Sequence, residues 1–363
     1  MKRIVLAAVL MAQCCLPASA TQLYFGADLS YYGQMMDCKA VYKDGGQPAD
    51  IFTIFKNHGA NLIRVRVWTD GNKTPYSNLP DAMRVIRAAK AQGMQVLLDF
   101  HYSDSWADAG KQIIPAAWAD IHDPDALADT LYRYTAYVMT TLDKQGLMPE
   151  MVQVGNEINP EMLMPAAEPK GQDHPRAIDW ARNAKFINAG IRAVREAGAK
   201  SQIKPRIMLQ IAQPEYVEPW FAAAAKAGVT DFDLIGISYY GHMWSTYDIP
   251  GTGEVIKRLR KAYPQKDVML VETAFPYDVD APGMHSNLSG KAAMPGYPVT
   301  IEGQKKFLVD LTKAVLAAGG DGVNYWAPDL VPNGCPTRNT GSRTSLFDLD
   351  GNVLPAIDFM KAR

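Results

Sequence analysis

Two glutamates end short apolar runs of the kind that form buried strands. Glu157 follows the run that starts at Met151, with Asn156 directly before it. Glu272 follows the run that starts at Val268. Parallel strands end at one edge of a sheet, and α/β enzymes keep their catalytic groups at that edge. Two carboxylates that meet there are the minimum set of groups for cleaving a glycosidic bond.

A retaining glycosidase uses one carboxylate as the nucleophile and the other first as an acid and then as a base, at a separation of about 5–5.5 Å. The acid must keep its proton near neutral pH, and the neighbouring negative charge raises its pKa. When the nucleophile is esterified to sugar, that charge disappears and the pKa of the acid falls. Glu157 and Glu272 together could therefore carry out a double displacement.

An arginine near the same edge could keep the nucleophile ionised through a charge-assisted hydrogen bond. Arg64 and Arg66 alternate with apolar residues and share one face of a predicted strand with Trp68. The sequence leaves open whether either guanidinium faces the nucleophile or pairs with another carboxylate.

Other predicted strands also end on groups suited to sugar binding. His101 leads into a polar loop that contains Asp104 and ends on Trp106. Tyr240 follows the sixth strand, and Trp326 ends the eighth. An indole in such a position can form the floor under a sugar ring.

The elements that position these residues alternate between strand and helix along the chain. Strands are predicted at residues 24–29, 61–68, 95–100, 151–157, 206–211, 234–239, 268–271 and 322–326. Helices are predicted at residues 48–57, 81–92, 123–145, 176–197, 216–227, 254–262, 302–318 and 356–360. Strict alternation predicts a parallel sheet, and eight units predict a closed (β/α)8 TIM barrel of the α/β class. An open doubly wound sheet is disfavoured because residues 28–32 lack a glycine-rich phosphate turn.

The composition excludes some classes of partner. The 363 residues are 48% hydrophobic, with 7 Trp, 17 Tyr and a net charge of −1. A near-neutral chain has neither the basic field for nucleic acid nor a polybasic patch for membranes. We therefore expect no nucleic-acid partner, and we expect a monomer.

Residues 1–20 are predicted to be a signal peptide. Lys2 and Arg3 precede an apolar run over residues 4–11, and residues 18–20 supply the small residues of a cleavage site. The run is too short to span a bilayer. We expect residues 21–363 to form one exported catalytic barrel, either extracellular or periplasmic, with no membrane attachment after cleavage.

Two cysteines, Cys38 and Cys335, remain after cleavage. In an oxidising compartment one bridge is favoured over two free thiols. Because the first and last strands of a closed barrel are neighbours, the bridge would join their loops.

The sequence predicts no metal site and no cofactor. Neither a His-Glu-x-x-His motif nor a paired cysteine spacing occurs. The loop that contains Asp278, Asp280, His285 and Asn287 could hold calcium. Its composition fits an ordinary polar loop at least as well.

The motifs resemble those of the endo-β-1,4-galactanases of glycoside hydrolase family 53, a retaining family of barrels. The resemblance covers nearly all of the mature chain, and the strand-three stretch with the following Gly-Lys-Gln is its most specific part. It is carried by residues 63–68, 98–106, 110–112, 155–158, 236–240, 271–273 and 346–348. One departure is Ala109, which stands where the family usually has proline.

The resemblance implies that Glu157 is the acid/base and Glu272 the nucleophile. It also implies that Asn156 binds the 2-hydroxyl of the sugar and that Tyr240 and Arg64 orient the nucleophile. It further implies that Asp104, Trp106 and Lys111 lie in the loop that lines the cleft and that Trp326 lies under the −1 sugar. His101 is predicted to bind substrate from its position at the end of a strand, although a lone histidine is more often structural than catalytic. The implied substrate is β-1,4-galactan or arabinogalactan.

Two other functions remain open from the sequence. One is a related glycanase, a β-mannanase or a cellulase, with the same glutamates and different cleft loops. The other is a non-catalytic barrel that binds sugar. The second is disfavoured because the chain keeps both Glu157 and Glu272.

Overall fold

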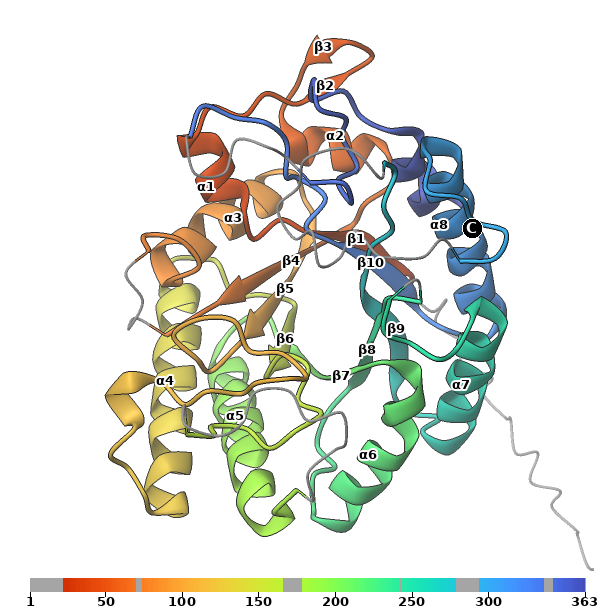
Figure 1. Ribbon diagram of the computed structural model, residues 1–363. Coiled ribbons are helices and arrows are strands. Elements are labelled where there is room, and N and C mark those ends of the chain that lie inside the picture. Colours follow the sequence, from red (N-terminus) through yellow and green to blue (C-terminus); the bar gives the residue numbers. More distant parts are fainter. Residues whose placement is uncertain are drawn as a thin grey trace, which may run out of the picture.

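The computed structural model describes residues 22–69, 74–165, 178–241, 243–278, 294–335 and 342–362. Eight strands close into a barrel in the order β1-β10-β9-β8-β7-β6-β5-β4, with every pair parallel. Helices surround the barrel (Figure 1). The predicted (β/α)8 TIM barrel is confirmed.

The eight barrel strands lie close to their predicted positions, except that β6 ends at Val154, three residues before its predicted end. They are β1 (Tyr24–Asp28), β4 (Leu62–Val67), β5 (Gln95–Phe100), β6 (Met151–Val154), β7 (Arg206–Ala212), β8 (Leu234–Tyr239), β9 (Asp267–Thr273) and β10 (Gly322–Trp326). The outer helices are α2 (Ile51–Asn57), α3 (Leu79–Ala91), α4 (Pro124–Lys144), α5 (Trp180–Lys200), α6 (Pro214–Lys226), α7 (Ile249–Ala262) and α8 (Ile301–Ala317). Short 3-10 helices are η1 (Ala116–Trp118) and η3 (Pro355–Lys361).

Most outer helices begin at a polar side chain that accepts a hydrogen bond from a backbone N–H of the first turn. These caps are Asp50, Asn78, Asp123, Asp179, Asp248 and Thr300. The caps explain two errors in the predicted boundaries. The helix predicted from residue 48 begins at Ile51, and the helix predicted from residue 254 begins at Ile249.

The chain between β1 and α2 contains structure that was not predicted. A short helix, α1 (Tyr32–Asp37), follows β1, and β2 (Lys43–Asp44) pairs with β3 (Gln47–Pro48) in an antiparallel ribbon. Pro48, predicted to be helical, is therefore part of a strand. These elements are too short to show a period in the sequence.

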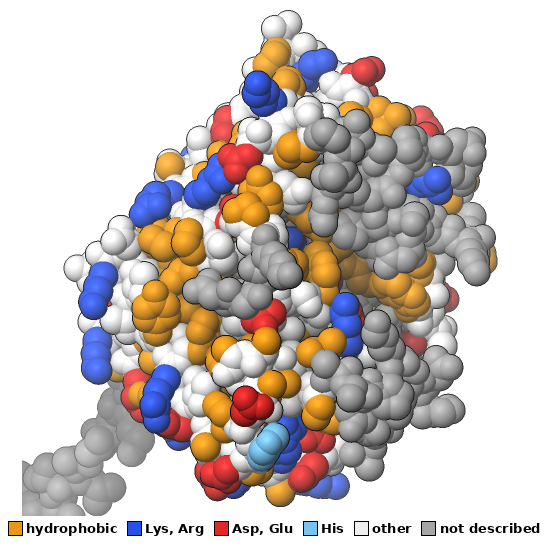
Figure 2. Space-filling view, turned by 60° about the vertical axis from the view of Figure 1, so that its left-hand side comes forward, with side chains coloured by type: hydrophobic (Ala, Val, Ile, Leu, Met, Phe, Trp, Pro, Cys, Tyr) orange, Lys and Arg blue, Asp and Glu red, His pale blue; other side chains and the backbone are white. Residues whose placement is uncertain are grey.

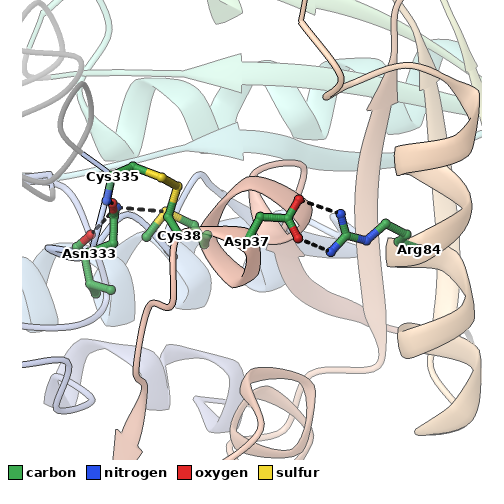
Figure 3. Close-up of a disulfide and its surroundings, with 7 residues drawn as sticks. Asp37, Cys38, Arg84, Asn333 and Cys335 are labelled. Atoms are coloured by element: carbon green, nitrogen blue, oxygen red, sulfur yellow. Dashed lines mark hydrogen bonds and ion pairs between the residues drawn. A yellow bond between two sulfur atoms is a disulfide. The ribbon is translucent and has the colours of Figure 1, made fainter.

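The predicted disulfide between Cys38 and Cys335 is confirmed (Figure 3). The two Cα atoms are 5.1 Å apart, and the bridge joins residues 297 positions apart in the chain. Cys38 directly follows α1, and Cys335 lies in the segment after β10. Since β1 pairs with β10, the bridge ties the loops of neighbouring strands.

The interior of the barrel begins with an apolar layer. It consists of Tyr24, Leu62, Leu97, Met151, Met208, Leu234, Met269 and Val271. Every one of these side chains is almost completely buried. Among the described residues, no helix is both long and apolar enough to cross a membrane.

Candidate active site

A polar layer lies above the apolar layer because side chains two positions apart on a strand face the same side. The polar residues two positions beyond an apolar interior residue are Arg64, Asp99, Gln153 and Gln210. All four side chains are buried and hydrogen-bonded to one another or to nearby residues. Along these strands, the interior side chains therefore change from apolar to polar within two residues.

A β-bulge directs Glu272 into this layer. Ile237 of β8 pairs with Leu270 of β9, but the next residue, Ser238, pairs with Glu272, so Val271 is an extra residue in β9. Val271 belongs to the apolar interior layer. Strict alternation would therefore have placed Glu272 on the outer face of the barrel. The bulge instead places it beside the inward-facing Ser238.

Three donors converge on the carboxylate of Glu272. The Arg64 Nη1 atom lies 2.7 Å from Oε1, and Gln210 Nε2 donates to the same oxygen over 3.0 Å. The Tyr240 hydroxyl donates to Oε2 over 3.0 Å. Burial raises the pKa of Glu272 above its ordinary value, and Arg64 and Gln210 offset part of that rise. These contacts favour the ionised carboxylate over its protonated form.

Arg64 connects this carboxylate to the rest of the polar layer. Its guanidinium lies 2.8 Å from Asp28 and 2.9 Å from Asp99, and it donates to Asn156 Oδ1 over 2.6 Å. Burial would lower the pKa of Arg64, but the carboxylates of Asp99, Glu272 and Asp28 raise it. Both alternatives left open by the sequence are thus true, because Arg64 pairs with Glu272 and with two other carboxylates.

Glu157 follows β6 in a left-handed backbone conformation. Its φ is +45°, and Gly155 two positions earlier has a φ of +86°. The backbone N–H of Glu157 donates to Gln210 Oε1 over 3.0 Å. The N–H of Ala109 donates to Glu157 Oε2 over 3.3 Å, a contact that proline at position 109 would lack.

Glu157 and Glu272 therefore have different electrostatic surroundings. Burial raises the pKa of Glu157, and the charge of Glu272 raises it further. No cation is paired with Glu157 within the described part of the chain. The one proton that two such carboxylates share at neutral pH is consequently favoured on Glu157.

The two glutamates face a cavity of about 260 Å³. Of the ten predicted site residues, nine line it; they are Arg64, His101, Trp106, Lys111, Asn156, Glu157, Tyr240, Glu272 and Trp326. Asp104 is not among the lining residues. Its carboxylate accepts hydrogen bonds from the Thr69 hydroxyl and from the N–H of Ala116, so it ties the strand-three loop to its neighbours.

His101 joins the polar layer to the same loop. Its Nδ1 accepts from Trp68 Nε1 and from the N–H of Ala107, each over 3.2 Å. A neutral ring with an accepting Nδ1 carries its proton on Nε2, which lies 3.0 Å from Asp99. Ala107 in turn accepts at its carbonyl from Asn156 Nδ2 over 2.8 Å.

Sequence reasoning did not assign a site role to Asp28, Asp99, Gln153, Gln210 or Trp244. Asp28 and Trp244 line the cavity, and the other three belong to the hydrogen-bonded layer below it. A polar residue inside a strand that is otherwise apolar was the available signal for Gln153 and Gln210. Trp244 lies in a loop, where sequence pattern gives no such signal.

No group of three or more potential metal ligands occurs among the described residues. The loop considered for calcium falls mostly outside them: Asp280, His285 and Asn287 are not described, and Asp278 is.

Comparisons with known proteins agree with this geometry. The sequence model described as Glycosyl hydrolase family 53 matches residues 24–360. An arabinogalactan endo-β-1,4-galactanase of Cellvibrio japonicus (strain Ueda107) is 44% identical over 352 residues, which cover 95% of this chain and 92% of that protein. An endo-β-1,4-galactanase of Bacillus subtilis (strain 168) is 33% identical over 82% of this chain and 67% of its own length.

Solved structures resemble the barrel over almost its whole length. The GH53 catalytic domain of Ignisphaera aggregans has a TM-score of 0.81 at 28% identity and covers 95% of this chain and 97% of its own. A structure from a study of two fungal β-1,4-galactanases has a TM-score of 0.76 at 26% identity, covering 93% of this chain and 98% of its own.

Proposed function

The chain belongs to glycosyl hydrolase family 53, and from this membership and the geometry of its site we propose that it is an endo-β-1,4-galactanase. It hydrolyses internal β-1,4-galactosidic bonds of galactan or arabinogalactan with retention of configuration. The observation that carries the proposal is the asymmetry of the carboxylate pair. Arg64, Gln210 and Tyr240 donate to Glu272, whereas burial and the charge of Glu272 raise the pKa of Glu157.

In the first step, ionised Glu272 attacks the anomeric carbon while protonated Glu157 donates its proton to the glycosidic oxygen. The carbon–oxygen bond to the leaving sugar breaks, and an ester between the glycosyl residue and Glu272 forms. Tyr240 has a pKa raised well above its usual value by burial and by both glutamates. Its hydroxyl therefore stays neutral and donates to Glu272 throughout.

In the second step, the negative charge of Glu272 is absent because it is esterified. The pKa of Glu157 falls, and its carboxylate accepts a proton from water as that water attacks the anomeric carbon. The ester bond breaks, and Glu272 leaves as a carboxylate beside Arg64. Two inversions at the same carbon give overall retention.

The remaining lining residues hold the polysaccharide. We assign the 2-hydroxyl of the −1 sugar to Asn156, which Arg64 and the Ala107 carbonyl already fix. Trp326 forms the floor under that sugar, with its ring centroid 6.1 Å from that of Trp106. Lys111 and His101 supply further polar groups on the cavity wall.

Hydrolysis of a polysaccharide panel with reducing-end detection tests this function. Purified mature chain should release reducing ends from β-1,4-galactan and leave mannan and carboxymethylcellulose intact. Cleavage of mannan or carboxymethylcellulose without cleavage of galactan would instead establish a β-mannanase or a cellulase. Binding of galactan without hydrolysis would establish a sugar-binding barrel.

We further propose that residues 1–20 direct export and that residues 21–363 act as one monomeric catalytic domain outside the cytoplasm. On the face that Figure 2 shows, Lys and Arg side chains are scattered among Asp and Glu rather than gathered in one field. Together with the net charge of −1, the coloured part of this face offers no basic field for nucleic acid or an anionic membrane, which agrees with a neutral polysaccharide as the substrate.

A further inference from the structure

Gln112 lies in the loop between β5 and α4, in the stretch Gly110-Lys-Gln112 that the sequence marks out. Its side chain is 5% exposed, and it does not line the cavity. It therefore lies behind the residues that line the cavity. The proposed mechanism gives it no role.

The carboxamide of Gln112 connects two segments of the site. Its Nε2 donates to the carbonyl of Asn156 over 2.8 Å and to the carbonyl of Glu157 over 3.2 Å. It also donates to the carbonyl of Asp108 over 3.1 Å. The two hydrogens of this amide nitrogen are thus shared among three carbonyls, two beside the acid/base and one in the loop that faces it.

The backbone of Glu157 needs such support. A non-glycine residue with a φ of +45° is in the sparsely populated left-handed region, and it stays there only when its surroundings hold it. Gln210 holds the N–H of Glu157, and Gln112 holds its carbonyl. If one of these hydrogen bonds is lost, the backbone of Glu157 could leave the left-handed conformation and turn the carboxylate away from the cavity.

Gln112 also fixes the loop that contacts the Glu157 carboxylate. Asp108 and Lys111 exchange two backbone hydrogen bonds, of 2.8 and 3.0 Å, which close a tight turn. This turn presents the N–H of Ala109 to Glu157 Oε2. Because Gln112 binds the Asp108 carbonyl, the same side chain sets both the backbone of Glu157 and the position of the donor to its carboxylate.

We propose that Gln112 is a positioning residue for the acid/base, which holds Glu157 where it can protonate the glycosidic oxygen. This inference rests on the proposed function, because it presumes that Glu157 is the proton donor. It predicts a defect that depends on how much the leaving group needs a proton.

The test compares kcat/KM on galactan with kcat/KM on a dinitrophenyl β-galactobioside, whose leaving group needs no proton. Gln112→Ala should lower kcat/KM on galactan by about 10-fold or more, a part of the 10²–10⁴-fold that general acid catalysis contributes. On the dinitrophenyl substrate it should stay within about 3-fold of wild type, because Glu272 is untouched. If Gln112→Ala does not fold, Gln112→Met keeps the side-chain volume and removes the same donor.

Gln304 provides a matched control. It is also a buried glutamine, and its Nε2 donates to the carbonyls of Phe275 and Ser345 over 2.9 and 3.1 Å. Gln304→Ala should lower the unfolding temperature as much as Gln112→Ala does. Any loss of kcat/KM in Gln304→Ala should be equal on the two substrates. An equal loss on both substrates in Gln112→Ala would overturn the proposal, and so would full activity on galactan.

Glu157→Ala and the wild-type enzyme separate this outcome from failure of the proposed function. A wild-type enzyme that leaves galactan intact would refute the function itself. A Glu157→Ala variant that slows both substrates equally would refute the role of Glu157. The positioning role of Gln112 is refuted when the wild-type enzyme and Glu157→Ala behave as proposed and Gln112→Ala does not.

Discussion

Arg64 and Glu272 form a buried ion pair at the centre of the barrel mouth, with Nη1 and Oε1 2.7 Å apart and side chains 1% and 7% exposed. The same guanidinium faces Asp28 and Asp99. The Arg64 guanidinium is therefore the positive charge that compensates three buried carboxylates. We expect both stability and catalysis to depend on it.

Replacing Arg64 with Met should reduce both the stability of the protein and its catalytic activity. Breaking a buried ion pair from one side leaves uncompensated charge and typically costs about 3–5 kcal/mol of unfolding free energy. Without the cation the pKa of Glu272 rises, so the acid limb of the kcat/KM profile should move to higher pH. We also expect kcat/KM on galactan to fall by at least about 10²-fold. Urea unfolding and a pH–rate profile measure the two effects.

Arg84→Met is the control for Arg64→Met. Arg84 pairs with Asp37 over 2.8 Å, but the two side chains are 41% and 46% exposed (Figure 3). Exposed pairs of this kind contribute about 0–1 kcal/mol. An Arg64 variant that is no less stable than Arg84→Met would contradict the assigned role of the buried pair.

Asp329 should make stability fall as pH rises. It is fully buried after β10, and no other described residue hydrogen-bonds its carboxylate. Burial raises the pKa of Asp329 to about 8. Between about pH 4 and 8 the folded state keeps the proton that the unfolded state loses, so stability declines by up to ~1.4 kcal/mol per pH unit. Asp329→Asn cannot ionise and should remove this decline.

Urea unfolding at pH 5 and pH 8 measures the effect. The stability of Asp329→Asn relative to wild type should increase from the lower to the higher pH. Asp358 offers a contrast, because its hydrogen bonds to His58 and Lys361 lower its pKa against the effect of burial. Asp358→Asn should not gain stability relative to wild type as pH rises. A gain for Asp329→Asn that is equal at both pH values would refute the buried titration.

The disulfide between Cys38 and Cys335 should stabilise the barrel strongly. A cross-link restricts the unfolded chain more strongly when it closes a longer loop. Loss of a native bridge typically costs about 2–5 kcal/mol of unfolding free energy. Replacing both cysteines with Ser should lower the unfolding free energy by an amount in that range. A reductant should destabilise the wild type to the same level and leave the double variant unchanged. Two freely alkylated thiols in the native exported protein would contradict the bridge.

The sequence predicted the barrel from local strand and helix patterns, and it predicted nine of the cavity-lining residues from strand ends and from the motifs shared with the family. Alternation placed Arg64 and Arg66 on one face of a strand, and the position of Glu157 at the end of a strand marked it as a site residue. The orientation of Glu272 did not follow from alternation, because a bulge at Val271 reverses the face. A bulge depends on how two strands pair, and one sequence does not reveal that pairing. The contacts of Gln210 with both glutamates depend on barrel closure in the same way.

The roles of the two glutamates can be separated with azide. In the proposed mechanism, Glu157→Ala keeps the nucleophile but lacks the proton donor and the base. A dinitrophenyl galactobioside needs no proton on its leaving group, so it should glycosylate Glu272 in this variant and the ester should accumulate. Azide needs no base, and its attack on the ester should give the β-azide because two inversions restore the configuration.

Glu272→Ala should give the opposite product. Without the nucleophile no glycosyl ester can form, and azide occupies the space that the side chain leaves. A single displacement at the anomeric carbon then inverts the configuration and gives the α-azide, as NMR of the product would show. The α-azide from Glu157→Ala together with the β-azide from Glu272→Ala would reverse the assignment. The stereochemistry of one product from each variant therefore decides whether Glu272, the carboxylate that Arg64 contacts, is the nucleophile.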